Sequence, residues 1–212
     1  VGDAFSLNKE LLVALGPDIA FIPGTAESPQ VAEIENLGIA VYVSSPATVT
    51  EVIEDIVRVA KVVGADKAAE DLAGQMKRDL DALTSKLEAL GGERRSVLAV
   101  LDQDLWTVGS GSFLDDVLRL SGAENIAGDI DIQYFQISME EVLAKDPDAI
   151  LVTIPEDQIA GLKEQVAWGQ LRAVKENAVY YVDSDLVSRP GPYIVDAIGE
   201  IAAHLYPDSV GN

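Results

Sequence analysis

The stretch Trp106-Thr-Val-Gly-Ser-Gly-Ser-Phe-Leu-Asp-Asp-Val-Leu-Arg-Leu-Ser-Gly-Ala-Glu-Asn-Ile126 decides the fold, because it places an aromatic residue and a glycine loop directly before a capped helix. Ser112 is suited to the N-cap, with Asp115 at the third helical position, and Gly122 follows the helix. Trp106 therefore stands where a strand passes into a helix. Two interpretations stay open: the wall of a binding cleft, or an ordinary turn whose tryptophan fills the core.

The glycines of this loop do not form a known phosphate-binding pattern. A dinucleotide fingerprint needs a third glycine for close helix packing, and Leu114 stands at that position after Gly109 and Gly111. A Walker loop needs Gly-Lys-Ser or Gly-Lys-Thr, and the sequence contains neither.

The composition of the 212 residues is that of a globular protein with a sizeable core, since 48% are hydrophobic. Thirty-six acidic against fifteen basic residues give a net charge of −21, which argues against nucleic-acid binding. No apolar run approaches the roughly 18 residues of a membrane span, so we expect no direct membrane insertion in this segment. The absence of cysteine excludes disulfides and thiolate chemistry.

Alternating helix and strand patterns indicate an α/β fold, and an internal echo indicates two Rossmann-like lobes. Residues 12–22 and 142–152 each show a helix end, a Pro-Asp turn and a buried strand. Residues 40–43 and 179–182 each form the next strand. The offset would put the counterpart of the Trp106 segment before Val1, so we expect the first lobe to be N-terminally incomplete. A signal or lipid anchor would then lie outside this chain.

Two helices follow the strands of the first lobe, and the second of them is expected to join the lobes. One runs over 49–63 and begins at a capping box of Thr48 and Glu51. The next covers 66–90 with a single apolar stripe, about 36 Å long, and suits a backbone helix that joins the lobes, although a plain core helix is the alternative. The expected organisation is a partial N-terminal lobe over 1–65, a connecting helix over 66–90 and a C-terminal lobe over 91–212.

Few residues suit catalysis. His204, the only histidine, lies in the apolar-periodic last helix, where a structural role is expected. With no cysteine and one histidine, we expect no catalytic residues, no protein-bound metal and no cofactor.

Two segments favour ligand contact instead. Arg189 precedes a Pro-Gly-Pro turn, where its planar guanidinium suits an anionic group, unless it pairs with Asp183 or Asp185. Tyr134 and Phe135 are expected in a loop before a capped helix, either touching ligand or buried beneath the loop.

Five segments together resemble the substrate-binding proteins of ABC importers for ferric siderophores, cobalamin and haem. They are 106–113, Gly122-Ala-Glu-Asn-Ile126, Ile137-Ser-Met-Glu-Glu-Val-Leu143, Asp146-Pro-Asp-Ala-Ile150 and Ser188-Arg-Pro-Gly-Pro192. The resemblance runs over almost the whole chain. It implies two α/β lobes joined by one long helix, an extracytoplasmic location in the periplasm or on a lipid anchor, and capture of a small-molecule metal chelate between the lobes for delivery to ABC permease subunits.

The resemblance also implies which residues act. The ligand contacts would be Phe5, Thr25, Trp106, Tyr134, Phe135 and Arg189. Glu27, in the first lobe, would pair with an arginine of the permease.

The chain departs from the family pattern at two positions. Ser188 stands where the second docking glutamate is expected, which leaves Asp185, Glu156 or Asp157 for that role. Tyr193 stands where the pattern has an arginine.

Other functions stay open from the sequence alone. One is an enzyme on a doubly wound α/β fold, although this sequence has no evident set of acid, base and nucleophile. The other is a sensor or interaction module that keeps the fold without a role in transport. Among chelates we expect a ferric siderophore or cobalamin before haem.

Overall fold

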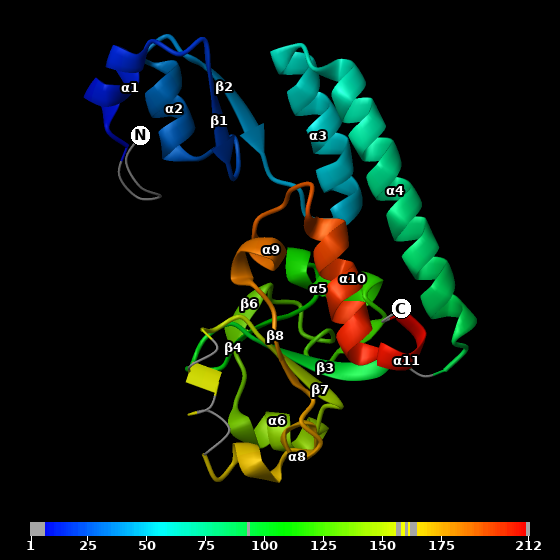
Figure 1. Cartoon of the computed structure of the whole chain (residues 1–212). Coiled ribbons are helices and arrows are strands. Elements are labelled where there is room, and N and C mark those ends of the chain that lie inside the picture. Colours follow the sequence, from blue (N-terminus) through cyan, green and yellow to red (C-terminus); the bar gives the residue numbers. More distant parts are fainter. Residues whose placement is uncertain (1–6, 93, 156–157, 160, 162–164, 211–212) are drawn as a thin grey trace. The chain divides into compact units, whose positions relative to one another are not determined.

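The computed structural model describes residues 7–92, 94–155, 158–159, 161 and 165–210, and this part of the chain consists of helices and mainly parallel strands (Figure 1). The α/β fold class expected from the sequence is confirmed. The chain divides into two compact units, Val1–Pro46 and Ala47–Asn212. The second unit thus includes the helices over 49–63 and 66–89, while the lobe bounds inferred from the sequence stay a prediction.

In its described residues, from Leu7 on, the first unit holds two helices and two strands. In chain order they are α1 (Lys9–Leu15), β1 (Ile19–Pro23), α2 (Pro29–Glu35) and β2 (Ala40–Ser44). The strands β1 and β2 pair in parallel over their whole length. A small core of Leu12, Ile34 and Ile39 lies in this unit.

The second unit holds the other elements. They are α3 (Val49–Val63), α4 (Asp66–Ala89), β3 (Arg95–Val100), β4 (Trp106–Val108), α5 (Phe113–Leu120), β5 (Ala123–Asn125), β6 (Tyr134–Gln136), α6 (Met139–Lys145), β7 (Ala149–Val152), the 3-10 turn η1 (Trp168–Gln170), α8 (Arg172–Lys175), β8 (Val179–Tyr181), α9 (Ser184–Ser188), α10 (Ile194–Leu205) and α11 (Pro207–Val210).

A parallel sheet in the order β5-β3-β7-β8 forms the centre of the second unit. All four strands point the same way, so their carboxyl ends meet at one edge, where ligands bind in open α/β sheets. Figure 1 shows α5 and α10 on one side of this sheet and α6 and α8 on the other. Because both faces are covered, β7 and the last four residues of β3 are apolar and buried.

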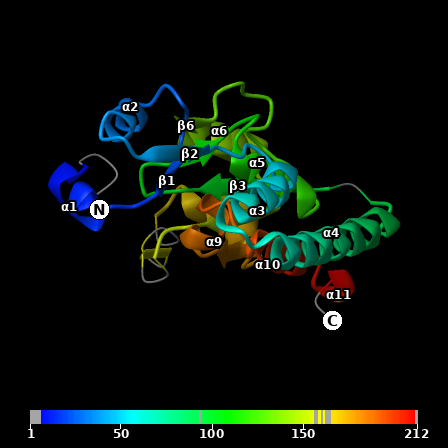
Figure 2. The same ribbon diagram turned by 90° about the horizontal axis from the view of Figure 1, so that it is seen from above.

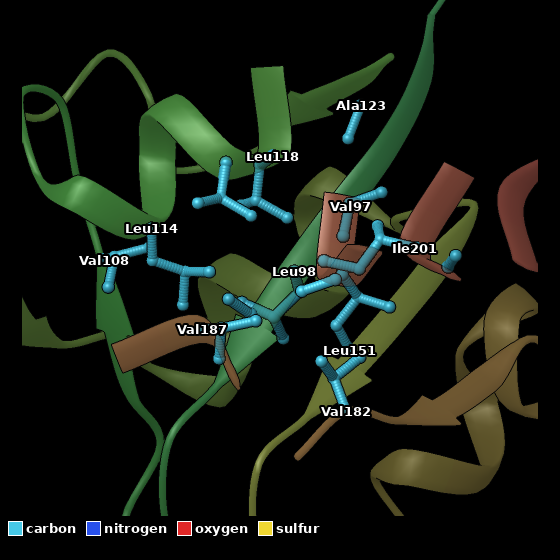
Figure 3. Packing of buried hydrophobic residues seen from close by; sticks show 14 of the residues in the cluster. Val97, Leu98, Val108, Leu114, Leu118, Ala123, Leu151, Val182, Val187 and Ile201 are labelled. Atoms are coloured by element: carbon cyan, nitrogen blue, oxygen red, sulfur yellow. The ribbon is translucent and has the colours of Figure 1, made fainter. Parts of the chain in front are cut away.

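The core of the second unit is built from that sheet and its helices (Figure 3). Leu98 and Leu151 come from β3 and β7, Leu118 from α5 and Ile201 from α10. The second tryptophan of the chain, Trp168, is also buried in this cluster. It therefore has a packing role that differs from the exposed position of Trp106.

Helices α3 and α4 pack side by side in both views (Figures 1 and 2). The side chain of Thr48 caps α3, accepting a hydrogen bond from the Glu51 amide, and the Asp116 carboxylate from α5 accepts one from the Val49 amide. Gly64 ends α3 in the left-handed conformation. The 24-residue α4 agrees with the predicted long helix, and none of the described helices is long and apolar enough to cross a membrane.

The internal echo is confirmed at the level of secondary structure, but only β7 is the buried strand that was predicted, because β1 is partly exposed along its length. Each repeat contains a helix, a left-handed C-cap, a Pro-Asp turn and a strand: α1 and β1 around Gly16, and α6 and β7 around Asp146. The following strand then pairs in parallel in both cases, β2 with β1 and β8 with β7. Each Pro-Asp turn therefore introduces one strand of a parallel pair.

The second Pro-Asp turn locks the amino end of the sheet. The Asp148 carboxylate accepts hydrogen bonds of 2.8 Å from both the amide and the hydroxyl of Ser96, and its other oxygen lies 2.9 Å from Arg172. Partial burial opposes ionisation, but these hydrogen bonds and the charges of Arg172 and Arg95 outweigh it and hold the pKa of Asp148 below its ordinary value. The ionised carboxylate thus ties β3 to β7.

Candidate functional site

The short ribbon of β4 and β6 presents two aromatic side chains on one face. The strands pair antiparallel, with Trp106 opposite Gln136 and Val108 opposite Tyr134. Residues directly opposite share a face, so Trp106 and Tyr134 are diagonal neighbours within reach of one ligand. Trp106 is 39% exposed and Tyr134 51%. An exposed pair of large aromatics is the kind of surface that a flat ligand covers.

Phe135 lies on the opposite face of this ribbon. It pairs with the fully buried Thr107 and packs against the core of the second unit. Its ring also borders Gly109, where an added β-carbon would lie 3.3 Å from the ring edge. The sequence left ligand contact and burial open for this aromatic pair. Phe135 packs against the core, and its contact with ligand stays a prediction.

The prediction that Tyr134 and Phe135 lie in a loop is wrong, because both residues belong to the strand β6. The reason lies in Gly109, which allows the chain to approach closely: a β-carbon there would stand 2.4 Å from the Ile132 carbonyl oxygen and 2.5 Å from that of Ile130. The Gly109 amide donates to the Gln133 carbonyl and the Ser110 amide to the Ile130 carbonyl. The pairing thus continues beyond β4 and β6.

A tight turn sets the position of Trp106 at the end of β3. The Asp102 carboxylate accepts hydrogen bonds from the amides of Asp104 (2.9 Å) and Trp106 (3.2 Å). Leu105 adopts φ of +62°, a left-handed conformation that is costly for a leucine. Sequence reasoning missed both residues, although an aspartate that starts a turn is a recognisable signal.

The glycine loop and the start of α5 follow the prediction. Gly111 has φ of +73°, and the Ser112 hydroxyl accepts a hydrogen bond of 3.1 Å from the Asp115 amide. The same hydroxyl donates to the Gly109 carbonyl at 2.9 Å. The N-cap therefore fixes the loop that leads away from Trp106.

The side chain of Asn125 connects the Gly122-Ala-Glu-Asn-Ile126 segment to its neighbours. Its amide nitrogen donates to the Val108 carbonyl at 2.9 Å and to the Asp115 carboxylate at 2.8 Å, while its oxygen accepts from the Ala127 amide. One side chain thus joins β4, α5 and the turn after β5. Its contacts are those of a scaffold residue.

Arg189 follows α9, in the segment after β8. Its guanidinium lies 3.0 Å from the Asp185 carboxylate, and both side chains are mostly exposed. The sequence left open whether Arg189 pairs with Asp183 or Asp185, and the structure shows the pair with Asp185. Val187 of the same helix belongs to the cluster that includes Val108 and Leu114, and Figure 3 shows these three on the same side of that cluster. This packing ties α9 to β4 and α5.

The remaining predicted residues are distributed as follows. Thr25 and Glu27 lie in the loop between β1 and α2 of the first unit, and both are exposed. Phe5, Glu156 and Asp157 lie outside the described residues.

A cavity of about 690 Å³ lies elsewhere in the second unit, along the edge strand β5. Its cationic groups already have partners within the chain: Lys145 donates to the Ile126 carbonyl and the Asp129 carboxylate, and Arg94 to the Arg119 carbonyl. The hydrogen bond from Lys145 lowers the pKa of Asp129. These contacts stabilise the scaffold rather than present charge to a ligand.

His204 packs as a structural residue in α10. Its ring stacks on Tyr180 with centroids 4.6 Å apart, and its Nε2 lies 3.9 Å from Glu200. No group of three or more histidine, aspartate or glutamate side chains in the described part of the chain is arranged to hold a metal ion.

Comparison with known proteins identifies the family. The family model described as periplasmic binding protein matches residues 1–186. An uncharacterized ABC transporter substrate-binding lipoprotein of Bacillus subtilis is 31% identical, over 99% of this chain and 68% of the relative. A vitamin B12-binding protein of Salmonella typhi is also 31% identical, over 94% of this chain and 73% of the relative.

Solved structures agree in fold. The periplasmic vitamin B12-binding protein of Vibrio cholerae superposes with a TM-score of 0.81 at 25% identity, covering 95% of this chain and 79% of that one. A periplasmic haem-binding protein of Roseiflexus has a TM-score of 0.83 at 21% identity, covering 95% and 80%, which shows the shared fold alone. The chain belongs to the periplasmic binding protein family, as a substrate-binding protein of the ABC transporter type and not an enzyme.

Proposed function

We propose that this protein binds a metal chelate of the ferric siderophore or cobalamin kind, with haem as a third choice, and delivers it to an ABC permease. The observation that carries the proposal is the exposed pair Trp106 and Tyr134 on one face of the β4–β6 ribbon, at the carboxyl end of β3. Vitamin B12-binding relatives support the choice of ligand class. No resident cofactor is part of the proposal.

The binding mode is stacking of the chelate on Trp106 and Tyr134. Aromatic side chains provide large contact areas with few rotatable bonds, so little entropy is lost when a rigid macrocycle or chelate is held. Arg189 supplies hydrogen-bond donors from the segment after β8. Ligand contact by Thr25 and Phe5 stays a prediction from the sequence. The ligand is bound and released without a chemical step.

Calorimetric titration tests this proposal. Cyanocobalamin, ferrioxamine B and haemin are each titrated into the protein, and one of them should bind with a stoichiometry of one. Trp106→Ala should weaken that binding about 30-fold, by ~2 kcal/mol, because a central aromatic contact is removed. Leu72→Ala is the matched control, since Leu72 on α4 is also 39% exposed. Equal affinities of the wild type and Trp106→Ala would contradict the proposal.

The proposed docking contacts are Glu27 and Asp185, which would face arginines of the permease. Glu27 is exposed, and Asp185 is exposed but shared with Arg189. Glu27→Lys should reduce the stimulation of permease ATPase activity without changing ligand affinity, whereas Glu35→Lys at the end of α2 should not. A location outside the cytoplasm, in the periplasm or on a lipid anchor, follows from the same role.

A further inference from the structure

Two carboxylates lie in the turn that carries Trp106, at the carboxyl end of β3. Asp102 bonds the amides of Asp104 and Trp106 directly, so its carboxylate lies beside the backbone of the tryptophan. Asp104 is exposed in the same turn, and its carbonyl accepts a hydrogen bond from the Gln136 side chain. Gln136 is the residue opposite Trp106 on β6. Two negative charges therefore belong to the turn that carries Trp106.

The segments after the other strands add charge of the same sign. In the described residues that follow β3, β5, β7 and β8 at this edge, up to the next helix or strand or, after β8, up to α10, the acidic side chains are Asp102, Asp104, Asp129, Asp131, Asp183 and Asp185. Arg189 is the one basic side chain in those same described segments.

The single arginine does not offset this charge. Its guanidinium lies 3.0 Å from Asp185, so the pair has no net charge and a negatively charged ligand would compete with that carboxylate. Asp129 is similarly paired with Lys145 of α6. Asp102, Asp104, Asp131 and Asp183 then remain in these segments, on a chain whose net charge is −21. The local and overall fields therefore have the same sign.

We infer that the site selects a neutral or cationic chelate over an anionic one. The inference rests on the proposed function, because it concerns the ligand of the same aromatic face. Carboxylates at the strand ends interact with the net charge of a bound ligand through water, and added salt screens this interaction. Each unit of negative charge on the ligand should therefore cost about tenfold in affinity at 10 mM salt.

Pairs of probes that share one chelate core and differ in charge test this inference. The first pair is cyanocobalamin, which is neutral, and the derivative in which one side-chain amide is hydrolysed to a carboxylate. The second is ferrioxamine B, with one positive charge, and its N-succinyl derivative, with one negative charge. The third is haemin dimethyl ester and haemin. The dissociation constants of each pair are measured by calorimetry at 10 mM and 500 mM NaCl.

We expect the more positive member of the binding pair to bind at least tenfold more tightly at 10 mM NaCl, and the ratio to shrink at 500 mM. The double variant Asp104→Asn/Asp183→Asn should reduce the ratio. Its fold should be kept, because the asparagine that replaces the N-cap Asp183 can still cap α9 through its side-chain oxygen. Asp81→Asn, an exposed position on α4, should leave the ratio unchanged.

Two different failures are distinguishable. If both members of a pair bind with equal affinity, or the anionic member binds more tightly, the charge selection is wrong while chelate binding stands. If no member of any pair binds, the proposed function itself is wrong.

Discussion

At the scale of single residues, the position of Trp106 depends on two neighbours that do not touch the ligand face. The Asp102 carboxylate accepts a hydrogen bond from the Trp106 amide. Leu105, one residue before the tryptophan, adopts a left-handed conformation. Strain of this kind costs about 1 to 3 kcal/mol and persists only where surrounding contacts impose it. Here the Leu105 carbonyl accepts a hydrogen bond from the Ile137 amide, so the end of the turn is joined to the residue that follows β6.

Thr107, the next residue of β4, gives a prediction about stability. Its side chain is fully buried, and its hydroxyl has no hydrogen-bond partner among the described residues. Thr107→Val replaces the hydroxyl with a methyl group of similar size, so the free energy of unfolding should rise by about 1 kcal/mol. Urea denaturation measures the change. A fall in the free energy of unfolding would mean that the hydroxyl is satisfied in solution.

At the scale of elements, the β4–β6 ribbon depends on the absence of a side chain at Gly109. Gly109→Ala would place a β-carbon about 2.4 Å from a backbone oxygen of the neighbouring segment, and backbone cannot move aside as a side chain can. We expect a loss of about 2 kcal/mol or more in the free energy of unfolding.

Gly191→Ala is the matched control for this substitution. The nearest atom to a β-carbon at Gly191 is the Arg189 carbonyl oxygen at 3.7 Å, an ordinary contact. Its thermal midpoint should stay near that of the wild type. If Gly109→Ala melts at the same temperature as Gly191→Ala, the close approach in the ribbon is not present in solution.

The sequence predicts the helices of this protein better than its ribbon. Capping residues and apolar periodicity are local signals, and they place α3 over Val49–Val63 and the N-caps Thr48 and Ser112 correctly. The strand β6 has three residues, too few for a periodicity, and its pairing depends on Gly109 about 25 positions earlier. Non-local pairing of this kind is invisible to a local pattern.

The same distinction applies to the candidate site. The composition of the Trp106 segment predicts an aromatic at a strand end, and Trp106 is exposed there. Sequence could not assign the faces of Tyr134 and Phe135, because a shift of one residue in the register would exchange them. Nor could it decide between ligand contact and the Asp185 pair for Arg189, since that requires the distance.

At the scale of the whole second unit, Asp148 links acid stability to the sheet. Its pKa is lower in the folded state than the ordinary 3.8, so its ionised form stabilises the fold fully above that pH. This contribution is lost as the pH falls below 3.8 through the folded-state pKa. Asp148→Asn should cost about 1 to 2 kcal/mol at pH 7, because charge-assisted hydrogen bonds to Ser96 and Arg172 are weakened.

Urea denaturation at several pH values checks this prediction. The difference between the wild type and Asp148→Asn should be constant at neutral pH and should narrow as the pH falls below 4. Asp71→Asn, on the exposed side of α4, is the control. Its free energy of unfolding should stay close to that of the wild type at every pH. A difference that widens in acid would show that the carboxylate does not stabilise the folded state.

The central claim is that one chelate covers both exposed aromatics of the β4–β6 ribbon. A double-mutant cycle with Trp106→Ala and Tyr134→Ala, measured by calorimetric titration of the chelate that binds, tests it most directly. We expect each single variant to lose affinity and the losses to be non-additive, with a coupling energy of about 0.5 kcal/mol or more. Wild-type affinity in both single variants and in the double variant would contradict the account.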